Sequence, residues 1–172
     1  LVDEFDGVGD LKRGIIRCVG EARERFQEDA LRMLRAVRFA AQLGFVLDEQ
    51  TKQAICELRE NLRKVSAERI QTELVKLLVS PHPERLLEAW ETGMTAVVLP
   101  EFDACMACEQ NNPHHSYSVG VHTIKSMGEV EADKVLRLTM LFHDFGKPQA
   151  KTTDANGIDH FRGHQKISEE LA

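Results

Sequence analysis

Apolar residues recur every three or four positions along most of this chain, which is the spacing of one face of an α-helix. In residues 26–44, for example, Leu34, Val37 and Ala41 fall on one face, and Gly44 is a typical residue to follow a helix end. The same reasoning predicts helices over residues 48–64, 66–80, 84–92, 121–130 and 131–144.

Strand signals are scarce in the same pattern. Only residues 14–19, with Ile15 and Ile16 between turn-forming neighbours, have the character of a β-strand. The helical pattern is interrupted near residues 20–25 and 104–113, where we expect domain boundaries. The chain is therefore predicted to be all-α, with at most one short strand.

The composition suits a globular domain. Of the 172 residues, 42% are hydrophobic and 29% are charged, which excludes a disordered tail. No stretch reaches the roughly 18 apolar residues that a membrane-spanning helix requires, and no signal peptide is visible. Four cysteines do not make a disulfide scaffold, so we expect a cytoplasmic protein without membrane contact. Because the chain starts at Leu1 and not at Met, and stops in mid-pattern at residues 168–172, we also expect it to be an internal piece of a longer protein.

Positive charge is concentrated in one segment of an otherwise acidic chain. The net charge is −6, yet residues 11–38 carry eight Lys or Arg against four Asp or Glu. Such asymmetry is expected where one surface meets phosphate groups, although long Arg side chains also solvate ordinary helix faces. Charge alone leaves both interpretations open.

Within this segment, Asp29 and Arg32 are three residues apart, so on one helix their side chains can lie side by side. Arg35 and Arg38 continue the series at the same step. A carboxylate beside a guanidinium group can pair with the hydrogen-bonding edge of a nucleobase, and further arginines can hold its phosphates. The alternative is an Asp–Arg pair that only supports the helix.

These residues resemble the tRNA nucleotidyltransferase (CCA-adding) and bacterial poly(A) polymerase family. Residues 28–32, Glu-Asp-Ala-Leu-Arg, match the family's EDxxR motif. The family's hinge motif, which joins a catalytic head to a neck, is matched by Asp6, Gly7, Asp10, Leu11, Ile16, Arg17 and Gly20. The resemblance implies that Asp29 and Arg32 pair with an incoming cytosine or adenine.

The resemblance covers residues 3–101 and implies further roles. Arg35 and Arg38 would lie near the nucleotide phosphates, and Arg69 resembles the last neck motif, which supports the neck and the tRNA. The family's head holds two divalent ions such as Mg²⁺ on paired carboxylates, and this chain contains no such motif. By resemblance, residues 1–25 would be the end of the head and the hinge, and residues 26–103 the helical neck and body.

Histidines gather in the second half of the chain. Six of the seven are His114, His115, His122, His143, His160 and His164, and Asp144 directly follows His143. Imidazole and carboxylate ligands suit Mn, Ni, Co, Fe or Zn ions, which can activate water for attack on a phosphoester. Histidines without any metal are the alternative, because His122 and His143 are 21 positions apart and this spacing allows many geometries.

Residues 104–172 resemble the first part of an HD-domain metal phosphohydrolase, through residues 121–123, 143–147 and 160–164. The resemblance implies that His122, His143 and Asp144 are metal ligands. It makes His160 and His164 candidates for a second metal or for substrate. The family's closing Asp ligand is not found in this chain. Cys105 and Cys108 have the spacing of a zinc or redox pair, but no second CxxC accompanies them, so we interpret both cysteines as structural.

Three functions compete on this evidence. The leading one is a transferase that adds CMP and AMP, or AMP alone, to an RNA 3′ end, with tRNA or another RNA, CTP and ATP as partners. The second is an HD-type phosphohydrolase, in which the neck would only support the HD domain. The third is a non-catalytic RNA-binding module. CCA addition and poly(A) addition share the Asp29–Arg32 pattern, so the pattern does not separate them.

Overall fold

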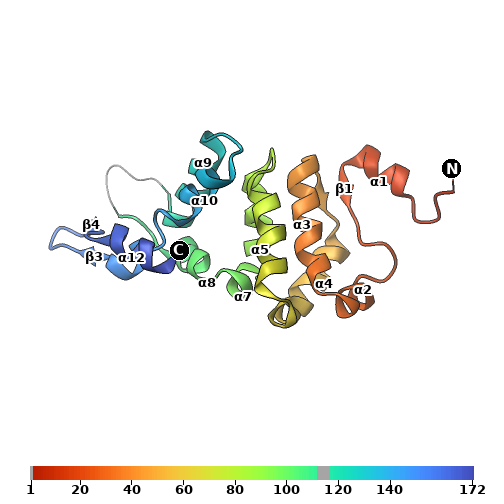
Figure 1. The fold of residues 1–172 in the computed structure, drawn as a ribbon, viewed down its shortest axis with the longest axis horizontal. Helices are drawn as coiled ribbons and strands as arrows, with labels where there is room; N and C mark the ends of the chain where they lie inside the picture. Colours follow the sequence, from red (N-terminus) through yellow and green to blue (C-terminus); the bar gives the residue numbers. More distant parts are fainter. Residues whose placement is uncertain (1, 112–116) are drawn as a thin grey trace. The chain divides into compact units, whose positions relative to one another are not determined.

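The computed structural model describes residues 2–111 and 117–172, and the chain divides into two compact units, Leu1–Val98 (unit 1) and Leu99–Ala172 (unit 2). Both units consist mainly of short helices, as Figure 1 shows, so the predicted all-α fold is confirmed. None of the helices in the described part of the chain is long and apolar enough to cross a membrane. The predicted domain limits at residues 25/26 and 103/104 stay predictions.

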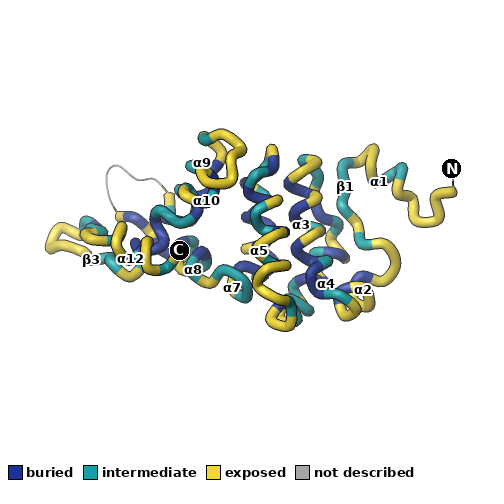
Figure 2. Tube along the Cα trace, in the orientation of Figure 1, coloured by how far each residue is buried: buried dark blue, intermediate teal, exposed yellow. Residues whose placement is uncertain are grey.

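Contacts between several short helices form the core of unit 1. Its elements are α1 (Gly7–Arg13), β1 (Ile15–Ile16), α2 (Ala22–Glu28), α3 (Leu31–Leu43), β2 (Val46–Leu47), α4 (Glu49–Leu58), η1 (Arg59–Lys64), α5 (Ala67–Leu78), η2 (Pro83–Arg85), α6 (Leu86–Glu91) and α7 (Thr95–Val98). Helix α3 lies against α5, and α2 lies against α4. Leu34 and Val37 on α3 and Leu77 and Leu78 on α5 are buried, in agreement with the predicted apolar faces, and Figure 2 shows buried stretches along both helices.

Local signals in the sequence explain where several of these helices begin and end. Helix α3 ends at Gly44, whose φ of 69° is a left-handed conformation that glycine adopts without strain. The carboxylate of Asp48 accepts a hydrogen bond from the N–H of Thr51 and so caps the start of α4. Ser66 occupies the corresponding position before α5, but its side chain makes no capping bond.

The predicted helix over residues 26–44 is interrupted, and this is the main departure from the sequence pattern. Asp29 has extended backbone angles (φ −149°, ψ 104°) and separates α2 from α3. Its carboxylate accepts a hydrogen bond from the N–H of Leu31 at 3.1 Å, which satisfies an amide at the start of α3. Asp side chains compete with the helix backbone in this way, and a break follows.

The predicted strand is present but short. Ile15 and Ile16 of β1 pair in parallel with Val46 and Leu47 of β2, an element that the sequence pattern did not indicate. This pairing ties the segment before α2 to the segment after α3.

Unit 2 contains α8 (Pro100–Ala107), α9 (Val119–Glu129), α10 (Lys134–Phe142), α11 (Lys147–Ala150), β3 (Thr152–Thr153), β4 (Asp159–His160) and α12 (His164–Leu171). Helix α9 lies against α8 and α10, α11 and α12 pack together, and β3 and β4 form an antiparallel pair. Asp133 caps α10 through the N–H groups of Val135 and Leu136, so the helix begins three residues after the predicted start of 131. Helices α8 and α12 were not predicted, and α8 runs through the expected boundary at residue 104.

Candidate functional site

Asp29 lies in the turn between α2 and α3 and is held there from two sides. One carboxylate oxygen accepts from the N–H of Leu31, and the other accepts from Nη2 of Arg69 on α5 at 2.9 Å. Partial burial raises the pKa of this carboxyl, but the two donors outweigh it, so the pKa of Asp29 is lowered overall. Asp29 is therefore a fixed, ionised acceptor, and a carboxylate has more lone pairs than these two bonds use.

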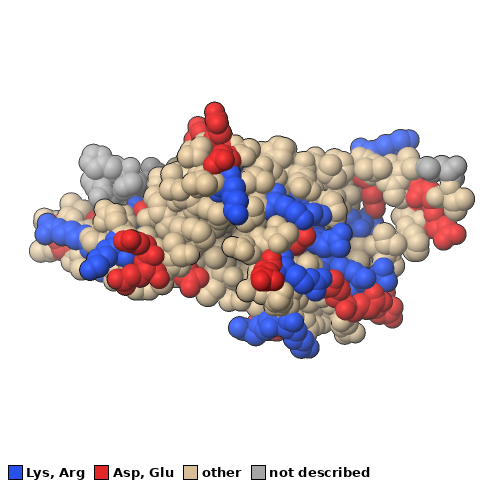
Figure 3. Space-filling model, in the orientation of Figure 1, with Lys and Arg blue, Asp and Glu red and all other residues tan. Residues whose placement is uncertain are grey.

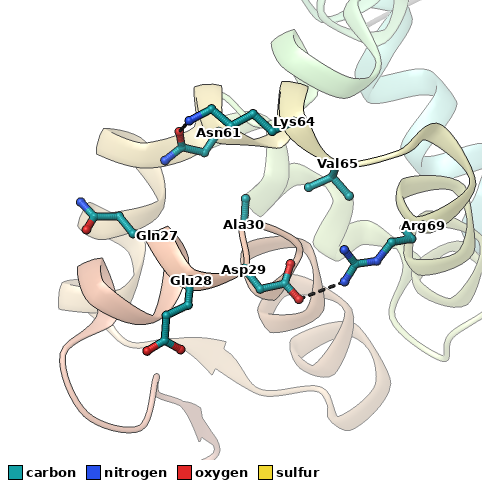
Figure 4. Close-up of a pocket in the computed structure, with 8 residues that line it drawn as sticks. All are labelled: Gln27, Glu28, Asp29, Ala30, Asn61, Lys64, Val65 and Arg69. Carbon is teal, nitrogen blue, oxygen red and sulfur yellow. Dashed lines mark hydrogen bonds and ion pairs between the residues drawn. The ribbon is translucent and has the colours of Figure 1, made fainter.

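A cavity of about 490 Å³ opens beside Asp29. Figure 4 shows its walls, which come from the α2–α3 turn, from η1 and from the start of α5. The residues that line it are Gln27, Glu28, Asp29, Ala30, Asn61, Lys64, Val65 and Arg69. Its volume lies in the range of small-molecule binding sites, and the lining offers acidic, basic and amide groups together.

Arg32 makes its hydrogen bonds with its own neighbours, while its positive charge also helps to lower the pKa of Asp29. Its Nη1 donates to Oε2 of Glu28 at 2.5 Å and to the carbonyl oxygen of Arg25 at 3.0 Å, while Nη1 of Arg25 donates to the same Glu28 oxygen at 2.9 Å. The expected side-by-side pair of Asp29 and Arg32 on one helix is thus corrected, because Asp29 stands outside α3.

Arg32 and Arg35 line a second cavity, of about 260 Å³, together with Arg17 and Arg25. Four guanidinium groups around one hollow give it positive charge that suits phosphate groups. This charge is partly offset, because Glu28 pairs with both Arg25 and Arg32, and Asp10 and Asp48 pair with Arg17. On the face drawn in Figure 3, Lys and Arg side chains gather over the part of unit 1 that contains α2, α3 and α5, with Asp and Glu among them. The two cavities therefore divide the predicted nucleotide residues, with Asp29 at the first and Arg32 and Arg35 at the second.

Arg38 lies elsewhere than the sequence reasoning implied. Its side chain is only 10% exposed, and its Nε lies 3.2 Å from Oε2 of Glu73 on α5, itself 9% exposed. Arg38 does not line either cavity. The physical reason is that α3 packs against α5, so the face that carries Arg38 is covered while the face that carries Arg35 stays exposed.

In unit 2, the structure brings together three of the predicted metal ligands. Ligand atoms of His122 on α9 and of His143 and Asp144 after α10 all lie within 4.8 Å of one another. Oδ2 of the buried Asp144 is 3.1 Å from Nε2 of His143 and 3.8 Å from Nε2 of His122. Nδ1 of His143 donates to the carbonyl oxygen of Met140 at 2.8 Å, which leaves Nε2 as the ring nitrogen that faces the carboxylate.

The two further candidate histidines, His160 and His164, lie in different places in unit 2. Nε2 of His164 lies 3.4 Å from Oδ1 of Asp144, so His164 is at the cluster. His160 instead pairs with Asp154 within the β3–β4 hairpin, at 3.0 Å, and stays away from the cluster. His114 and His115 lie outside the described residues.

Lys147 places a positive charge beside the carboxylate of Asp144. Its Nζ lies 2.8 Å from Oδ2 of Asp144 and donates to Oε1 of Gln110 at 3.1 Å. Burial raises the pKa of Asp144, but His143 and Lys147 outweigh it and lower that pKa to about 2. The pKa of His143 is raised, mainly by Asp144. The cluster is therefore an ionised carboxylate surrounded by imidazoles and one ammonium group.

The cysteine pair does not contribute thiolate ligands here. Cys105 and Cys108 are both buried, and burial raises the pKa of both thiols, that of Cys105 to about 12. A thiol that stays protonated is a poor metal ligand, in agreement with the structural interpretation.

Several residues at these sites carried no signal in the sequence. Asn61 and Lys64 reach the first cavity from η1, and Gln110 and Ser168 reach the histidine cluster from segments distant along the chain. Local spacing cannot indicate such residues, because long-range packing alone brings them to the site.

Comparison with known proteins finds a family model and relatives that match parts of this chain. Residues 44–106 match the family model described as a probable RNA and SrmB-binding site of polymerase A. The CCA-adding enzyme of Lactobacillus helveticus is 43% identical over 123 residues, which are 72% of this chain and 31% of that enzyme. The CCA-adding enzyme of Lactobacillus delbrueckii subsp. bulgaricus is 60% identical over 77 residues, 45% of this chain and 19% of that enzyme.

A solved structure agrees with these relatives. The Bacillus stearothermophilus CCA-adding enzyme, crystallised in complex with CTP, matches 60% of this chain and 27% of its own, with a TM-score of 0.57 and 43% identity. The resemblance to the CCA-adding enzyme and poly(A) polymerase family that the motifs predicted is confirmed. The chain spans about a third or less of the length of these relatives.

Proposed function

We propose that unit 1 selects the incoming nucleotide during the addition of CMP and AMP to the 3′ end of a tRNA. The observation that carries this proposal is the fixed, ionised carboxylate of Asp29 at a cavity of about 490 Å³, in a chain similar to CCA-adding enzymes. One of those relatives was crystallised with CTP. Polymerisation would need a pair of metal-binding carboxylates from outside this chain.

Nucleobase chemistry explains why an acceptor and a donor would select cytosine and adenine. Both bases present an exocyclic amino donor beside a ring-nitrogen acceptor, whereas uracil and guanine present a carbonyl acceptor beside a ring N–H donor. The carboxylate of Asp29 would accept from the amino group. Arg32, whose contacts to Glu28 and Arg25 both use Nη1, would donate to the ring nitrogen through its remaining N–H groups. Arg35 would meet the phosphates from the basic second cavity.

The same chemistry serves poly(A) addition if only AMP is used. The family model that matches residues 44–106 is named for polymerase A, so poly(A) addition is the alternative function. Incorporation of both CMP and AMP, as against AMP alone, distinguishes the two. We favour CCA addition because the relatives above carry that name.

The experiment uses a chimera in which the 123 matching residues of this chain replace their counterpart, 31% of the Lactobacillus helveticus enzyme. Losing a hydrogen bond to a charged partner costs about 1.5–3 kcal/mol, so Asp29→Ala should reduce discrimination against UTP and GTP by roughly 10- to 150-fold. Asp29→Asn should admit UMP and GMP most readily, because an amide can turn its N–H toward their carbonyl groups.

The control variant is Glu24→Ala, which removes an exposed carboxylate from α2. It should leave both tRNA binding and nucleotide choice unchanged. The assignment of Asp29 is wrong if the Asp29 variants keep wild-type discrimination among the four nucleotides.

A second proposal concerns unit 2, where the cluster of His122, His143 and Asp144 favours a divalent metal centre of the HD type. The residues fit such an ion, because His143 presents Nε2 and the Asp144 carboxylate is buried and ionised. A bound ion would supply water of lowered pKa for phosphoester hydrolysis. His122, His143 and Asp144 would hold the ion. To make room for it, Lys147 would give up its contact with Oδ2 of Asp144.

Metal analysis tests this second proposal. We expect the 172-residue chain to hold less than one transition metal per chain after dialysis, and to show little activity on bis-p-nitrophenyl phosphate. The double substitution His143→Ala with Asp144→Ala should abolish Co²⁺ binding in a titration. Tight metal that survives this double substitution would contradict the assignment, and the absence of any binding would favour a non-catalytic RNA-binding role.

A further inference from the structure

The carboxylates of the first cavity, the one beside Asp29, are already paired with cations of unit 1. Oε2 of Glu28 lies 2.9 Å from Nη1 of Arg25 and 2.5 Å from Nη1 of Arg32. Oδ2 of Asp29 lies 2.9 Å from Nη2 of Arg69. The acidic groups that line this cavity therefore need no cation from a ligand.

Lys64 is different, because it has no counter-ion among the residues that the structure describes. It is exposed on η1, and its Nζ donates a hydrogen bond to Oδ1 of Asn61 at 3.0 Å. Figure 4 shows these two side chains together on the η1 wall of the cavity, apart from the pair of Asp29 and Arg69. The amide oxygen of Asn61 is neutral, so the positive charge of Lys64 stays uncompensated and attracts an anionic ligand.

Asn61 adds hydrogen-bond donors beside this charge. Because its Oδ1 accepts from Lys64, its Nδ2 is the end of the amide that remains for a ligand, and it carries two N–H groups. Leu62, which directly follows Asn61, is completely buried and anchors η1 in the core of unit 1. An ammonium group and an amide N–H held side by side suit the charged oxygens of one phosphate group.

The position of Glu28 indicates which phosphate group this is. Glu28 lines the first cavity, whereas its partners Arg25 and Arg32 line the second, so the two cavities are neighbours with these ion pairs between them. Under the proposed function, the phosphates of the incoming nucleotide lie at the second cavity with Arg35. The 3′ end of the RNA must lie next to that nucleotide, because its 3′ oxygen is the atom that joins the α-phosphorus. The first cavity offers this RNA strand a phosphate site of its own.

We propose that Lys64 and Asn61 bind a backbone phosphate near the 3′ end of the RNA acceptor in the first cavity. This inference rests on the proposed function of unit 1. A contact with the sugar-phosphate backbone positions a strand without reading its bases. Such a contact suits a growing end, because the last base changes with each nucleotide added while the phosphates stay chemically the same.

The same chimera tests this assignment through its affinity for tRNA. A fluorescent tRNA that lacks its 3′ CCA is titrated at several salt concentrations, and KM for CTP is measured at saturating tRNA. Lys64→Gln should weaken tRNA binding about 10-fold, the lower end of the range for a hydrogen bond to a charged partner, because the site is exposed. The slope of log affinity against log salt concentration should become shallower by about 0.7, the value for one phosphate contact on a single strand. KM for CTP should not change.

Two further variants and a matched control locate the effect. Asn61→Asp places a carboxylate beside Lys64, which neutralises the charge without removing the lysine, and it should weaken tRNA binding as Lys64→Gln does. Lys64→Arg keeps the charge and should retain most of the affinity. Arg63→Gln removes the same charge one position away, from a side chain that is 64% exposed, pairs with Glu60 and does not line the cavity, and it should leave tRNA binding unchanged. Circular dichroism establishes that each variant is folded.

Uncharged phosphate analogues identify the contact itself. A set of tRNA acceptor-stem hairpins carries a neutral methylphosphonate at each of its 3′-terminal linkages in turn. At one linkage, this substitution should weaken binding to the wild-type chimera and have no further effect on the Lys64→Gln variant.

The outcomes separate this inference from the function on which it rests. If KM for CTP rises while tRNA affinity does not fall, Lys64 binds the nucleotide and the inference is wrong. It is also wrong if Lys64→Gln binds tRNA as the wild type does, if Arg63→Gln weakens binding equally, or if every methylphosphonate acts independently of Lys64. If instead the Asp29 variants keep wild-type discrimination among nucleotides, nucleotide selection by unit 1 fails, whereas the tRNA measurements still decide the role of Lys64.

Discussion

Replacing Arg38 by Met should destabilise unit 1 strongly, because it leaves the carboxylate of Glu73 buried without its main partner. The two side chains are only 10% and 9% exposed, and their nearest charged atoms are 3.2 Å apart. Removing one member of such a buried pair costs about 3–5 kcal/mol. Nζ of Lys76, 3.7 Å from the other oxygen of Glu73 and 47% exposed on its side chain, offers partial compensation, so we expect a value near the lower end, about 3 kcal/mol.

Urea unfolding followed by tryptophan fluorescence measures this loss. The chain has one tryptophan, Trp90 on α6, so its emission reports on unit 1. A loss of about 3 kcal/mol should lower the urea midpoint by roughly 1–3 M. Arg35→Met, at an exposed position three residues earlier, should change stability by less than about 0.5 kcal/mol.

The double variant Arg38→Met with Glu73→Met supplies the critical comparison. Replacing both members of a buried pair by apolar residues is often neutral, so the double variant should regain much of the stability that Arg38→Met loses. If Arg38→Met and Arg35→Met unfold at the same urea concentration, the pair does not hold α3 to α5.

Further predictions concern unit 2 and catalysis. Hydrogen bonds from Lys151 and other donors lower the pKa of Asp159 to about 2, below its unfolded value of 3.8, so its stabilisation should be lost as the pH falls from about 4 to about 2. Asp159→Asn should remove that part of the acid transition, which carboxyl ¹³C NMR and thermal melts can follow. Gly146→Ala should destabilise unit 2 by about 1–3 kcal/mol in thermal unfolding, since its methyl group meets backbone atoms of α12. Gly128→Ala, with no atom within 4 Å of the added methyl group, should stabilise unit 2 by about 0.4–1 kcal/mol. The purified chain alone should incorporate no labelled CMP or AMP into tRNA, because its sequence contains no paired-carboxylate strand motif; measurable incorporation by a sample free of host enzyme would contradict this.

The sequence by itself determined the class of the fold and most of its helices. Helix formation depends on contacts within four residues, so apolar spacing, Gly44 after α3 and Asp48 before α4 are visible in a linear pattern. The motifs likewise indicated the resemblance that the relatives confirm. The break at Asp29 was missed, although its cause is local: the carboxylate bonds the N–H of Leu31 in place of the helix pattern.

Only the tertiary structure decided which members of each motif share a site. Arg35 and Arg38 have the same chemistry and adjacent places in the pattern, yet α5 covers one of them and brings Glu73 to it. His160 and His164 are equally plausible ligands in sequence, but the β3–β4 hairpin pairs one with Asp154, whereas α12 carries the other to Asp144. Such outcomes depend on contacts between residues far apart in the chain, and these contacts are fixed by packing and burial that no local pattern contains.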